Sequence, residues 1–530
     1  MKYPSRTLSL LVAGALLVSM AGCSSNTASS SASSAAASVL AAEESTLSLA
    51  GATALTFTDS GISAAEGNYS GYAIEGTALT INAPGTYVLS GSCADGSVTI
   101  KAETEGVTLV LNGLDLTSTT TAPIVCGKST GVTIAVYGGT QNTLADTAAN
   151  DKDGTNASAD AESAVLKCKD GSQVVLCGSG TLNITAAGKN GIKSGTENEG
   201  RAASLTIREL TLNIDAPVND AINAEQTLEV ESGTLNISAG DDALHSDYTL
   251  NIGAADIAGP AITISACNEG LEGAELNIFS GTIDITATDD CLNAANGELT
   301  DYAFSMNISG GTINAYTSGG DGLDSNGSMT ISGGSITVWT ANTADNQPLD
   351  ADGTITITGG TVLAAGGSAG MGYTIDASQG YVTYGGMGAA STVRLTNGSA
   401  FTITDASGST VYSGTALCDA NYLFYCAADL AADSEYTLAT GSTTLAAATA
   451  QTGTTRATFG GMGGGTPGMT PPDAANGQTP PAMNGGTPGG QAPDGQDGTP
   501  PEKPAGSPSG TPPEMPAQNN ATSQAEIAAG

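Results

Sequence analysis

Short runs in which aliphatic and polar residues alternate recur through the middle of the chain. One stretch has Leu276 and Ile278, then Gly281, then Ile283 and Ile285. The next two stretches repeat this arrangement at Met306, Ile308, Gly311 and Ile313, and at Met329, Ile331, Gly334, Ile336 and Val338. Alternation with a period of two predicts strands that are buried on one face. The period of 3.6 that a helical repeat needs is not visible in these stretches.

A second phrase recurs between the alternating runs. It consists of a polar pair, a small residue, an aliphatic residue, a polar residue and usually Ala or Ser, as in D-D-A-L-H-S at 241–246. Its aliphatic positions are Ile192, Ile222, Leu244, Leu271, Leu292, Leu323 and Leu349. Two or three strands plus turns per repeat make one coil of a solenoid. The sequence therefore predicts an all-β parallel β-helix, in which one position per coil forms a column with a spacing of about 4.8 Å.

The N-terminal segment predicts export and anchoring. Residues 1–22 have an early basic pair followed by an apolar run, which is typical of a signal peptide. Met20-Ala21-Gly22-Cys23 resembles a lipobox, so we expect Cys23 to be lipidated and residues 23–42, rich in Ser and Ala, to be a flexible tether. These features predict a protein held at the outer face of the cell membrane, with membrane contact through this lipid anchor alone.

The remainder divides by pattern and composition. The repeats place a parallel β-helix at 43–375, and shorter strand patterns with Gly turns predict a small C-terminal β cap at 376–458. Of the 20 prolines, 14 follow Gly460, so residues 459–530 are expected to be a disordered tail. Eight cysteines follow Cys23, and they can be either buried thiols or bridges; Cys418 and Cys426 are spaced to close a hairpin.

The charge balance excludes one large class of function. The chain has 14 Lys and Arg against 52 Asp and Glu, for a net charge of −38. A protein that binds the nucleic-acid backbone needs a basic face, so nucleic acid is not an expected partner.

The chain resembles a bacterial family of cell-surface, carbohydrate-binding β-helix proteins. The resemblance is carried by I-N-A-P-G-T-Y-V-L-S-G at 81–91, by V-T-L-V-L-N-G-L-D-L at 107–116 and by the D-D-A-L-H-S type of turn, and it covers roughly residues 70–460. It implies a right-handed β-helix like that of polysaccharide lyases. It also implies bound calcium and binding of cellulose-type and pectin-type polysaccharide.

Stacking of the turn phrases places acidic residues in columns. Between Glu209 and Val393 there are 24 acids and no Lys or Arg, and two like charges about 5 Å apart repel by about 3 kcal/mol at an effective dielectric of 20. Oxygen ligands in such numbers select Ca²⁺. The predicted calcium ligands are Asp220, Asp241, Asp242, Glu269, Glu272, Asp289, Asp290, Asp321 and Asp324. His245, the single histidine, is interpreted as a passive turn residue, and a solvated acidic face without metal remains the alternative.

An aromatic pair is the candidate sugar shelf. Tyr316 and Trp339 occupy equivalent positions in neighbouring coils, and alternation from Ile313 and Ile336 points both rings outward. We therefore predict that they bind carbohydrate, with an exterior ladder without function as the alternative.

Catalysis is the other function that this fold can support. A lyase needs a Lys or Arg base, and the nearest ones, Lys189 and Lys193, precede the acidic coils. A hydrolase can use paired carboxylates such as Asp241-Asp242 or Asp289-Asp290, but no basic residue near them would grip a uronate. The sequence therefore favours a noncatalytic, calcium-dependent polysaccharide-binding protein over a lyase, a hydrolase or a structural adhesin with a protein partner.

Overall fold

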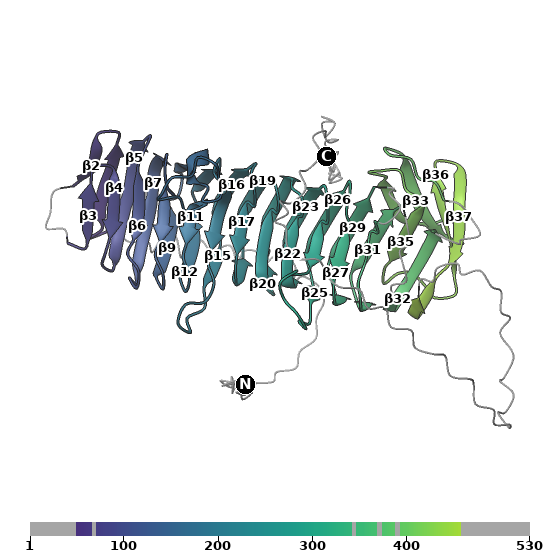
Figure 1. The fold of residues 1–530 in the computed structure, drawn as a ribbon. Coiled ribbons are helices and arrows are strands. Elements are labelled where there is room, and N and C mark those ends of the chain that lie inside the picture. The colour runs from purple at the N-terminus through teal and green to yellow at the C-terminus, as the bar shows by residue number, and fades with distance from the viewer. Residues whose placement is uncertain (1–48, 66–69, 342–345, 368–373, 387–392, 457–530) are drawn as a thin grey trace, which may run out of the picture. The chain divides into compact units, whose positions relative to one another are not determined.

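The computed structural model describes residues 49–65, 70–341, 346–367, 374–386 and 393–456, which form a parallel β-helix with a small β-sheet at its C-terminal end (Figure 1). The predicted all-β fold is confirmed: within these ranges the one helical element is the short 3-10 turn η1 (Ala148–Asn150). None of the described residues belongs to a helix with the length and apolar character of a membrane span. The predicted signal peptide, Cys23, the whole predicted tether and the tail lie outside the described residues.

Three parallel stacks of strands run along the solenoid. The first stack contains β4 (Ala78–Ile81), β6 (Ser97–Ile100), β8 (Ile124–Cys126), β11 (Ala164–Cys168), β14 (Asn190–Ser194), β17 (Ile222–Ala224), the first parts of β20 (Leu244–Ile252) and β22 (Leu271–Ile278), β24 (Leu292–Ala294) and β27 (Leu323–Ser325). The second contains the first parts of β5 (Gly85–Cys93) and β7 (Val107–Thr117), then β9 (Gly131–Val136), β12 (Gln173–Gly178), β15 (Ser204–Ile207), β18 (Thr227–Val230), the second parts of β20 and β22, β25 (Ser305–Ile308), β28 (Ser328–Ile331), β30 (Thr354–Ile357) and β32 (Thr374–Gly385). The third contains the end of β7, β10 (Gln141–Ala145), β13 (Thr181–Thr185), β16 (Thr211–Ala216), β19 (Thr234–Ala239), β21 (Ala261–Ala266), β23 (Thr282–Ala287), β26 (Thr312–Thr317), β29 (Ser335–Thr340) and β31 (Thr361–Gly366).

Further strand pairs cover both ends of the solenoid. At the N-terminal end, β1 (Thr53–Thr58) pairs in parallel with β5 and antiparallel with β2 (Gly61–Ala64), and β3 (Tyr72–Glu75) pairs antiparallel with β4. At the C-terminal end, β35 (Tyr422–Cys426) pairs with β31 and β32, and β38 (Gln451–Arg456) pairs with β32. Pairing of the last coil in this way uses backbone groups that would otherwise invite association between molecules.

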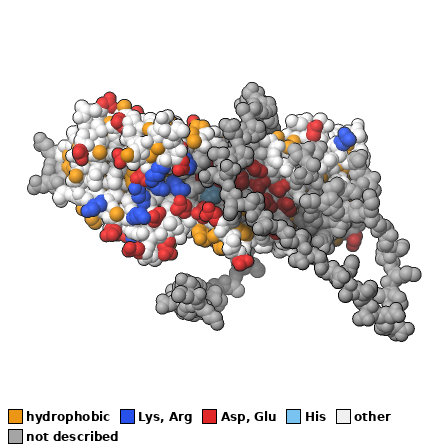
Figure 2. Space-filling view, in the orientation of Figure 1, with side chains coloured by type: hydrophobic (Ala, Val, Ile, Leu, Met, Phe, Trp, Pro, Cys, Tyr) orange, Lys and Arg blue, Asp and Glu red, His pale blue; other side chains and the backbone are white. Residues whose placement is uncertain are grey.

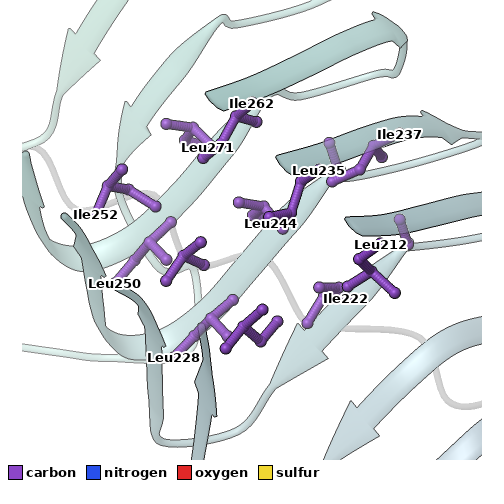
Figure 3. Packing of buried hydrophobic residues seen from close by; sticks show 14 of the residues in the cluster. Leu212, Ile222, Leu228, Leu235, Ile237, Leu244, Leu250, Ile252, Ile262 and Leu271 are labelled. Atoms are coloured by element: carbon purple, nitrogen blue, oxygen red, sulfur yellow. The ribbon is translucent and has the colours of Figure 1, made fainter. Parts of the chain in front are cut away.

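The interior is filled by ladders of aliphatic side chains, one from each coil. Ile222, Leu244 and Leu271 form one ladder in register, and Figure 3 shows it beside a second that contains Leu228 and Leu250. All five side chains are fully buried. Each such side chain contributes about 1.5–3 kcal/mol when it leaves water, so the repeated aliphatic position of the turn phrase helps to stabilise every coil together with the neighbouring ladders.

Glycines with a left-handed backbone begin successive strands of the third stack. Gly281, Gly311, Gly334 and Gly360 all have a positive φ, between 80° and 115°, and each directly precedes its strand. A Cβ atom on Gly334 would lie 2.9 Å from the backbone oxygens of Gly310 and Gly311 in the coil below. Any residue with a side chain would therefore be strained at this turn, which explains why the glycine recurs between the alternating runs.

A second hydrophobic core joins the solenoid to the predicted cap. The cap is a four-stranded antiparallel sheet of β34 (Thr410–Thr415), β33 (Ala400–Asp405), β36 (Glu435–Thr440) and β37 (Thr443–Thr449). Side chains on the outer face of the last coils, among them Trp339 and Leu363, pack there against Phe401 and Leu438. The sheet thus covers an outer face of the solenoid, while the solenoid's open end is paired separately by β35 and β38.

Candidate functional site

Two columns of polar side chains follow the first strand stack, as the turn phrases predict. We call the positions before the strands the turn column: Asp220, Asp242, Glu269, Asp290, Asp321 and Gln347. The strand column consists of Asn223, His245, Glu272, Asn293, Asp324 and Asp350. Strand pairing aligns the strand-column residues from Asn223 to Asp324 one above the next, and the bridge between Leu323 and Leu349 extends this register to Asp350. The predicted columns therefore exist, and their members lie on neighbouring coils.

The lower part of the site is a histidine surrounded by carboxylates. We call Asp242, His245 and Glu272 the histidine cluster, since their ligand-type atoms lie within 4.8 Å of one another. His245 Nδ1 is 3.1 Å from Asp242 Oδ2 and also contacts Glu272, while Nε2 is 2.9 Å from Asp247 Oδ1. Burial alone would lower the pKa of His245, but these three carboxylates together raise it to about 12.

The raised pKa favours the protonated form of His245 inside the acidic column at neutral pH. A protonated imidazole donates from both ring nitrogens, which matches acceptors on both sides of the ring. The expectation that no basic group relieves the repulsion in these coils is wrong at this position. His245 is also more than a passive turn residue, because it neutralises part of the charge on Asp242 and Glu272.

The upper part of the site is an all-carboxylate group. We call Asp321, Asp324 and Asp350 the aspartate cluster, and their oxygens also lie within 4.8 Å of one another. Asp321 accepts a hydrogen bond from the backbone N–H of Gln347, and Gln347 Nε2 donates to Asp350 Oδ2 at 3.3 Å. No basic side chain forms an ion pair with these three aspartates in the described part of the chain.

Glu269, Asp290 and Asn293 lie between the two clusters. Asn293 Nδ2 donates to Glu269 Oε2 at 2.9 Å, and Asp290 Oδ1 accepts from the backbone N–H of Asp321 at 2.6 Å. Asn293 is only 8% exposed and Gln347 only 4%. Among the described residues, neither Asn293 Oδ1 nor Gln347 Oε1 has a hydrogen-bond partner. Two buried amide oxygens in these columns are thus left without a donor, which is costly unless a cation or another donor satisfies them.

Burial makes the charged state of these carboxyls unfavourable. Desolvation first, and then neighbouring acids, raise the pKa of Glu269 to about 8 and the pKa values of Asp290 and Asp321 to about 7. The pKa of Asp324 is raised to about 6 for the same reasons, and that of Asp350 is also raised. A divalent cation would reverse this effect because it stabilises the ionised form.

The residues of the upper site fit calcium by their chemistry. Ca²⁺ takes six to eight oxygen ligands, both carboxylates and amide carbonyls. The aspartate cluster offers three carboxylates, Asp290 lies one coil below, and the unpartnered oxygens of Asn293 and Gln347 are of the right type. The histidine cluster fits less well, because His245 already supplies the positive charge there.

The other predicted ligands differ in how they are placed. Asp220 is buried at the start of the turn column, where its carboxylate accepts from Asn223 Nδ2 at 2.7 Å. Burial and the charge of Asp242 raise its pKa to about 6. Asp241 and Asp289, the first members of their polar pairs, are exposed and lie outside both clusters.

The turn phrases placed Asp350, Asn293 and Gln347 in the two columns, but none of the three was predicted as a calcium ligand. The two amides were passed over because only acids were considered as ligands. The register also continues below Asn223 to Lys193 and then Lys167. In Figure 2, basic side chains gather on the N-terminal side of the histidine and acidic ones on its other side. Strand alternation in A-V-L-K-C at 164–168 could have revealed Lys167.

The predicted sugar shelf of Tyr316 and Trp339 needs correction. The two residues are paired in register on β26 and β29, as expected. However, Trp339 is only 1% exposed, and its ring lies 5.9 Å from that of Phe401 in the cap. Tyr316 is partly buried against the same core. The rings do point away from the solenoid interior, but the cap covers them, so Trp339 cannot stack on a sugar in this structure.

Seven of the cysteines within the described ranges are buried free thiols: Cys93, Cys126, Cys168, Cys267, Cys291, Cys418 and Cys426. Cys418 belongs to the second core and Cys426 to the solenoid core, so they do not bridge a hairpin. Cys126 and Cys168 are neighbours on adjacent coils, and their contact, together with burial, raises the pKa of Cys126 well above its usual value. Of the two alternatives for these cysteines, buried thiols or disulfide bridges, the structure therefore supports buried thiols.

The raised carboxyl pKa values predict an unusual dependence of stability on pH. In the unfolded chain these groups titrate near pH 4, whereas Glu269 in the folded, metal-free protein has a pKa of about 8. The folded state therefore binds more protons between these two values, so its stability falls as the pH rises through the interval. We expect the melting temperature of EDTA-treated protein to decrease from about pH 5 to about pH 8. Calorimetry in matched buffers measures this, and a flat or rising curve would contradict the assigned carboxyl environments.

Comparisons with known proteins agree with the resemblance seen in the sequence. The sequence model of the carbohydrate-binding domain-containing proteins matches residues 75–370 and 255–457. A carbohydrate-binding domain-containing protein of Acetivibrio thermocellus is 26% identical over 239 residues, which cover 41% of this chain and 80% of that protein. The solved structure of the polysaccharide lyase-like protein from C. thermocellum, a gadolinium derivative, has 22% identity and a TM-score of 0.32. The matched region covers 57% of this chain and 96% of the chain in that solved structure.

Proposed function

Since this chain belongs to the family of carbohydrate-binding domain-containing proteins, we propose that it is a noncatalytic, calcium-dependent polysaccharide-binding lipoprotein of the cell surface. Its ligands would be plant cell-wall glycans of the cellulose or pectin type. The observation that carries the proposal is the buried carboxylate stack that ends in the aspartate cluster, with unpartnered amide oxygens at Asn293 and Gln347. Such a site is unfavourable without a cation.

Asp290, Asp321, Asp324 and Asp350 would hold calcium, with Asn293 and Gln347 as neutral ligands. Bound calcium would supply positive charge and free coordination positions for hydroxyl or carboxylate oxygens of a sugar. The protein's own residues fix where this happens, because the strand register keeps the ligands on adjacent coils. A chain of strongly negative net charge needs such a cation before it can accept a polyanion such as pectate.

Pull-down with insoluble pectate and with cellulose, in Ca²⁺ or in EDTA, tests the proposal. We expect pectate binding to require Ca²⁺ and to be lost in the double variant Asp321→Asn with Asp324→Asn. Glu75→Gln is the matched control, since it removes one negative charge from an exposed position of β3. Binding of both polysaccharides that is indifferent to EDTA and to the double variant would refute calcium dependence, and absence of all binding would refute the function.

The surface location rests on Cys23, which we propose to be the lipidated residue. Replacement of Cys23 by Ala should leave the precursor unprocessed or release the protein from membranes, because the lipid anchor would be the sole attachment. Membrane fractionation followed by immunoblotting measures this. An equal membrane-bound fraction in parent and variant would argue against the lipoprotein assignment.

A lyase is the second candidate, and Lys167 is the observation that favours it. Burial first, and then neighbouring Lys193, lower the pKa of Lys167, which is what a lysine base requires. Lys189 and Lys193 are less suited, since they pair with Asp153 at 2.7 Å and with Glu225 at 3.1 Å. A base of this kind would take the proton α to a uronate carboxylate while the glycosidic oxygen leaves. Formation of unsaturated product from polygalacturonate, abolished by Lys167→Ala, would favour the lyase over the noncatalytic protein.

A further inference from the structure

An aromatic cluster lies directly beside the histidine cluster and takes no part in the calcium site. Tyr248 follows Asp247 on β20, two coils below the segment that brings Tyr302 and Phe304. The rings of Tyr248 and Tyr302 are 6.3 Å apart at 71°, and those of Tyr302 and Phe304 are 5.4 Å apart at 52°. Tyr248 is 39% exposed, whereas Tyr302 and Phe304 are half-buried.

The cluster is created by an insertion in one coil. Ten residues, 295–304, connect β24 to β25, whereas two residues, 326–327, make the equivalent connection between β27 and β28. In the two coils below, no loop separates the first stack from the second, because β20 and β22 each continue from one stack into the other. In repeat proteins such insertions collect on one face, which is often the binding face.

The insertion is fixed to the lower coils by hydrogen bonds. Asn296 Nδ2 donates to the backbone oxygen of Asp247 at 2.9 Å, two coils below. The hydroxyl of Tyr302 donates to Glu275 Oε1 at 2.8 Å, one coil below. The segment therefore folds back along the solenoid and holds its rings against Tyr248 in a defined orientation.

The surroundings of Tyr248 combine apolar and polar groups. The carboxylate of Asp247 is 2.9 Å from His245 Nε2, and Tyr248 is the next residue along the chain. The aromatic rings therefore lie next to the charged strand column. Figure 2 shows hydrophobic side chains gathered close to the histidine and next to acidic ones. Ligand sites typically pair aromatic walls with a few fixed polar groups in this way.

We propose that Tyr248, supported by Tyr302 and Phe304, is a sugar-stacking subsite that binds one pyranose ring of a polysaccharide chain lying across the histidine cluster. The negative face of an aromatic ring attracts the polarised C–H groups on the flat side of a pyranose. The hydroxyl groups at the edge of the same sugar then face hydrogen-bonding groups such as the Asp247 carboxylate. This inference rests on the proposed polysaccharide-binding function and assigns that function a position and a contact.

Titration calorimetry with a soluble cello-hexasaccharide and with hexagalacturonate, in the presence of Ca²⁺, tests the subsite. Loss of one stacking ring in Tyr248→Ala should weaken binding about tenfold, and Tyr248→Phe should bind nearly as well as the parent. Tyr137→Ala is the matched control, because Tyr137 is also 39% exposed but lies outside the cluster. Neither alanine variant should change the melting temperature appreciably, since both rings are exposed.

Three results would count against the inference, and they are distinguishable. If the parent binds and Tyr248→Ala binds equally well, the rings merely pin the insertion and polysaccharide binding lies elsewhere. If the parent binds neither oligosaccharide in Ca²⁺, the proposed function itself fails, and the subsite fails with it. A loss that is shared by Tyr137→Ala would likewise count against a specific stacking role.

Discussion

Removal of calcium with EDTA is expected to lower the melting temperature of the purified protein, and Ca²⁺ should restore it better than Mg²⁺. A cation that binds the folded state alone stabilises it by about 2.7 kcal/mol at a hundredfold excess over its dissociation constant. The folded state is the one that brings Asp321, Asp324 and Asp350 within 4.8 Å of one another. Mg²⁺ demands a compact octahedral arrangement and dehydrates reluctantly, so it suits such a site less well.

The double variant Asp321→Asn with Asp324→Asn separates this effect from general charge screening. It should melt at a temperature that no longer responds to EDTA, because the cation has lost two carboxylates. It should also be more stable than metal-free parent protein above neutral pH, since the buried acids whose pKa values are raised to about 7 and about 6 are gone. Glu75→Gln should keep the full response. If the parent protein, shown metal-free by elemental analysis beforehand, melts alike with Ca²⁺ and EDTA, the column is a solvated acidic face.

Replacement of Trp339 by Ala is expected to destabilise the protein by about 3–5 kcal/mol, the usual cost of removing a large buried aromatic side chain. The Trp339 ring packs edge-on against Phe401 at 5.9 Å in the core beneath the cap. In a solenoid each coil interacts mainly with its neighbours, so the loss should appear as earlier melting of the C-terminal end. Hydrogen exchange of the backbone amides of β29, β31 and β33 shows whether the destabilised region is the C-terminal end.

Trp339→Phe is the matched control, since it keeps an aromatic ring in the same core and should cost less. Polysaccharide binding of both variants is expected to match that of the parent at temperatures where they are folded. If Trp339→Ala melts like the parent but binds cellulose more weakly, the covered position of the ring would be wrong, and the exposed sugar shelf would be restored.

The acid columns show which part of the site could be predicted from sequence. The positions of Glu269, Asp290 and Asp321 on successive coils follow from the spacing of Leu271, Leu292 and Leu323, because a buried aliphatic anchor fixes the register of the residues beside it. The charge state of the column could not be predicted in the same way. It depends on His245, whose ring is held by Asp242 and Asp247 of its own coil and by Glu272 of the next coil.

By itself, the sequence determined the parallel β-helix, the order of its coils and the columns on its first strand stack. These features depend on local alternation, on glycines that alone accept the tight turns, and on one aliphatic anchor in each coil. Only the tertiary structure decided what covers each outward face, because that depends on contacts between segments far apart in the chain. Trp339 is buried by Phe401 of the cap, whereas Tyr248 stays exposed beside an insertion tied back to Asp247. Alternation from Ile336 and Val338 points the Trp339 ring outward, whereas Tyr248 is exposed at the register irregularity of β20 between Ser246 and Thr249. The different surroundings of the two rings come from packing that no local pattern encodes.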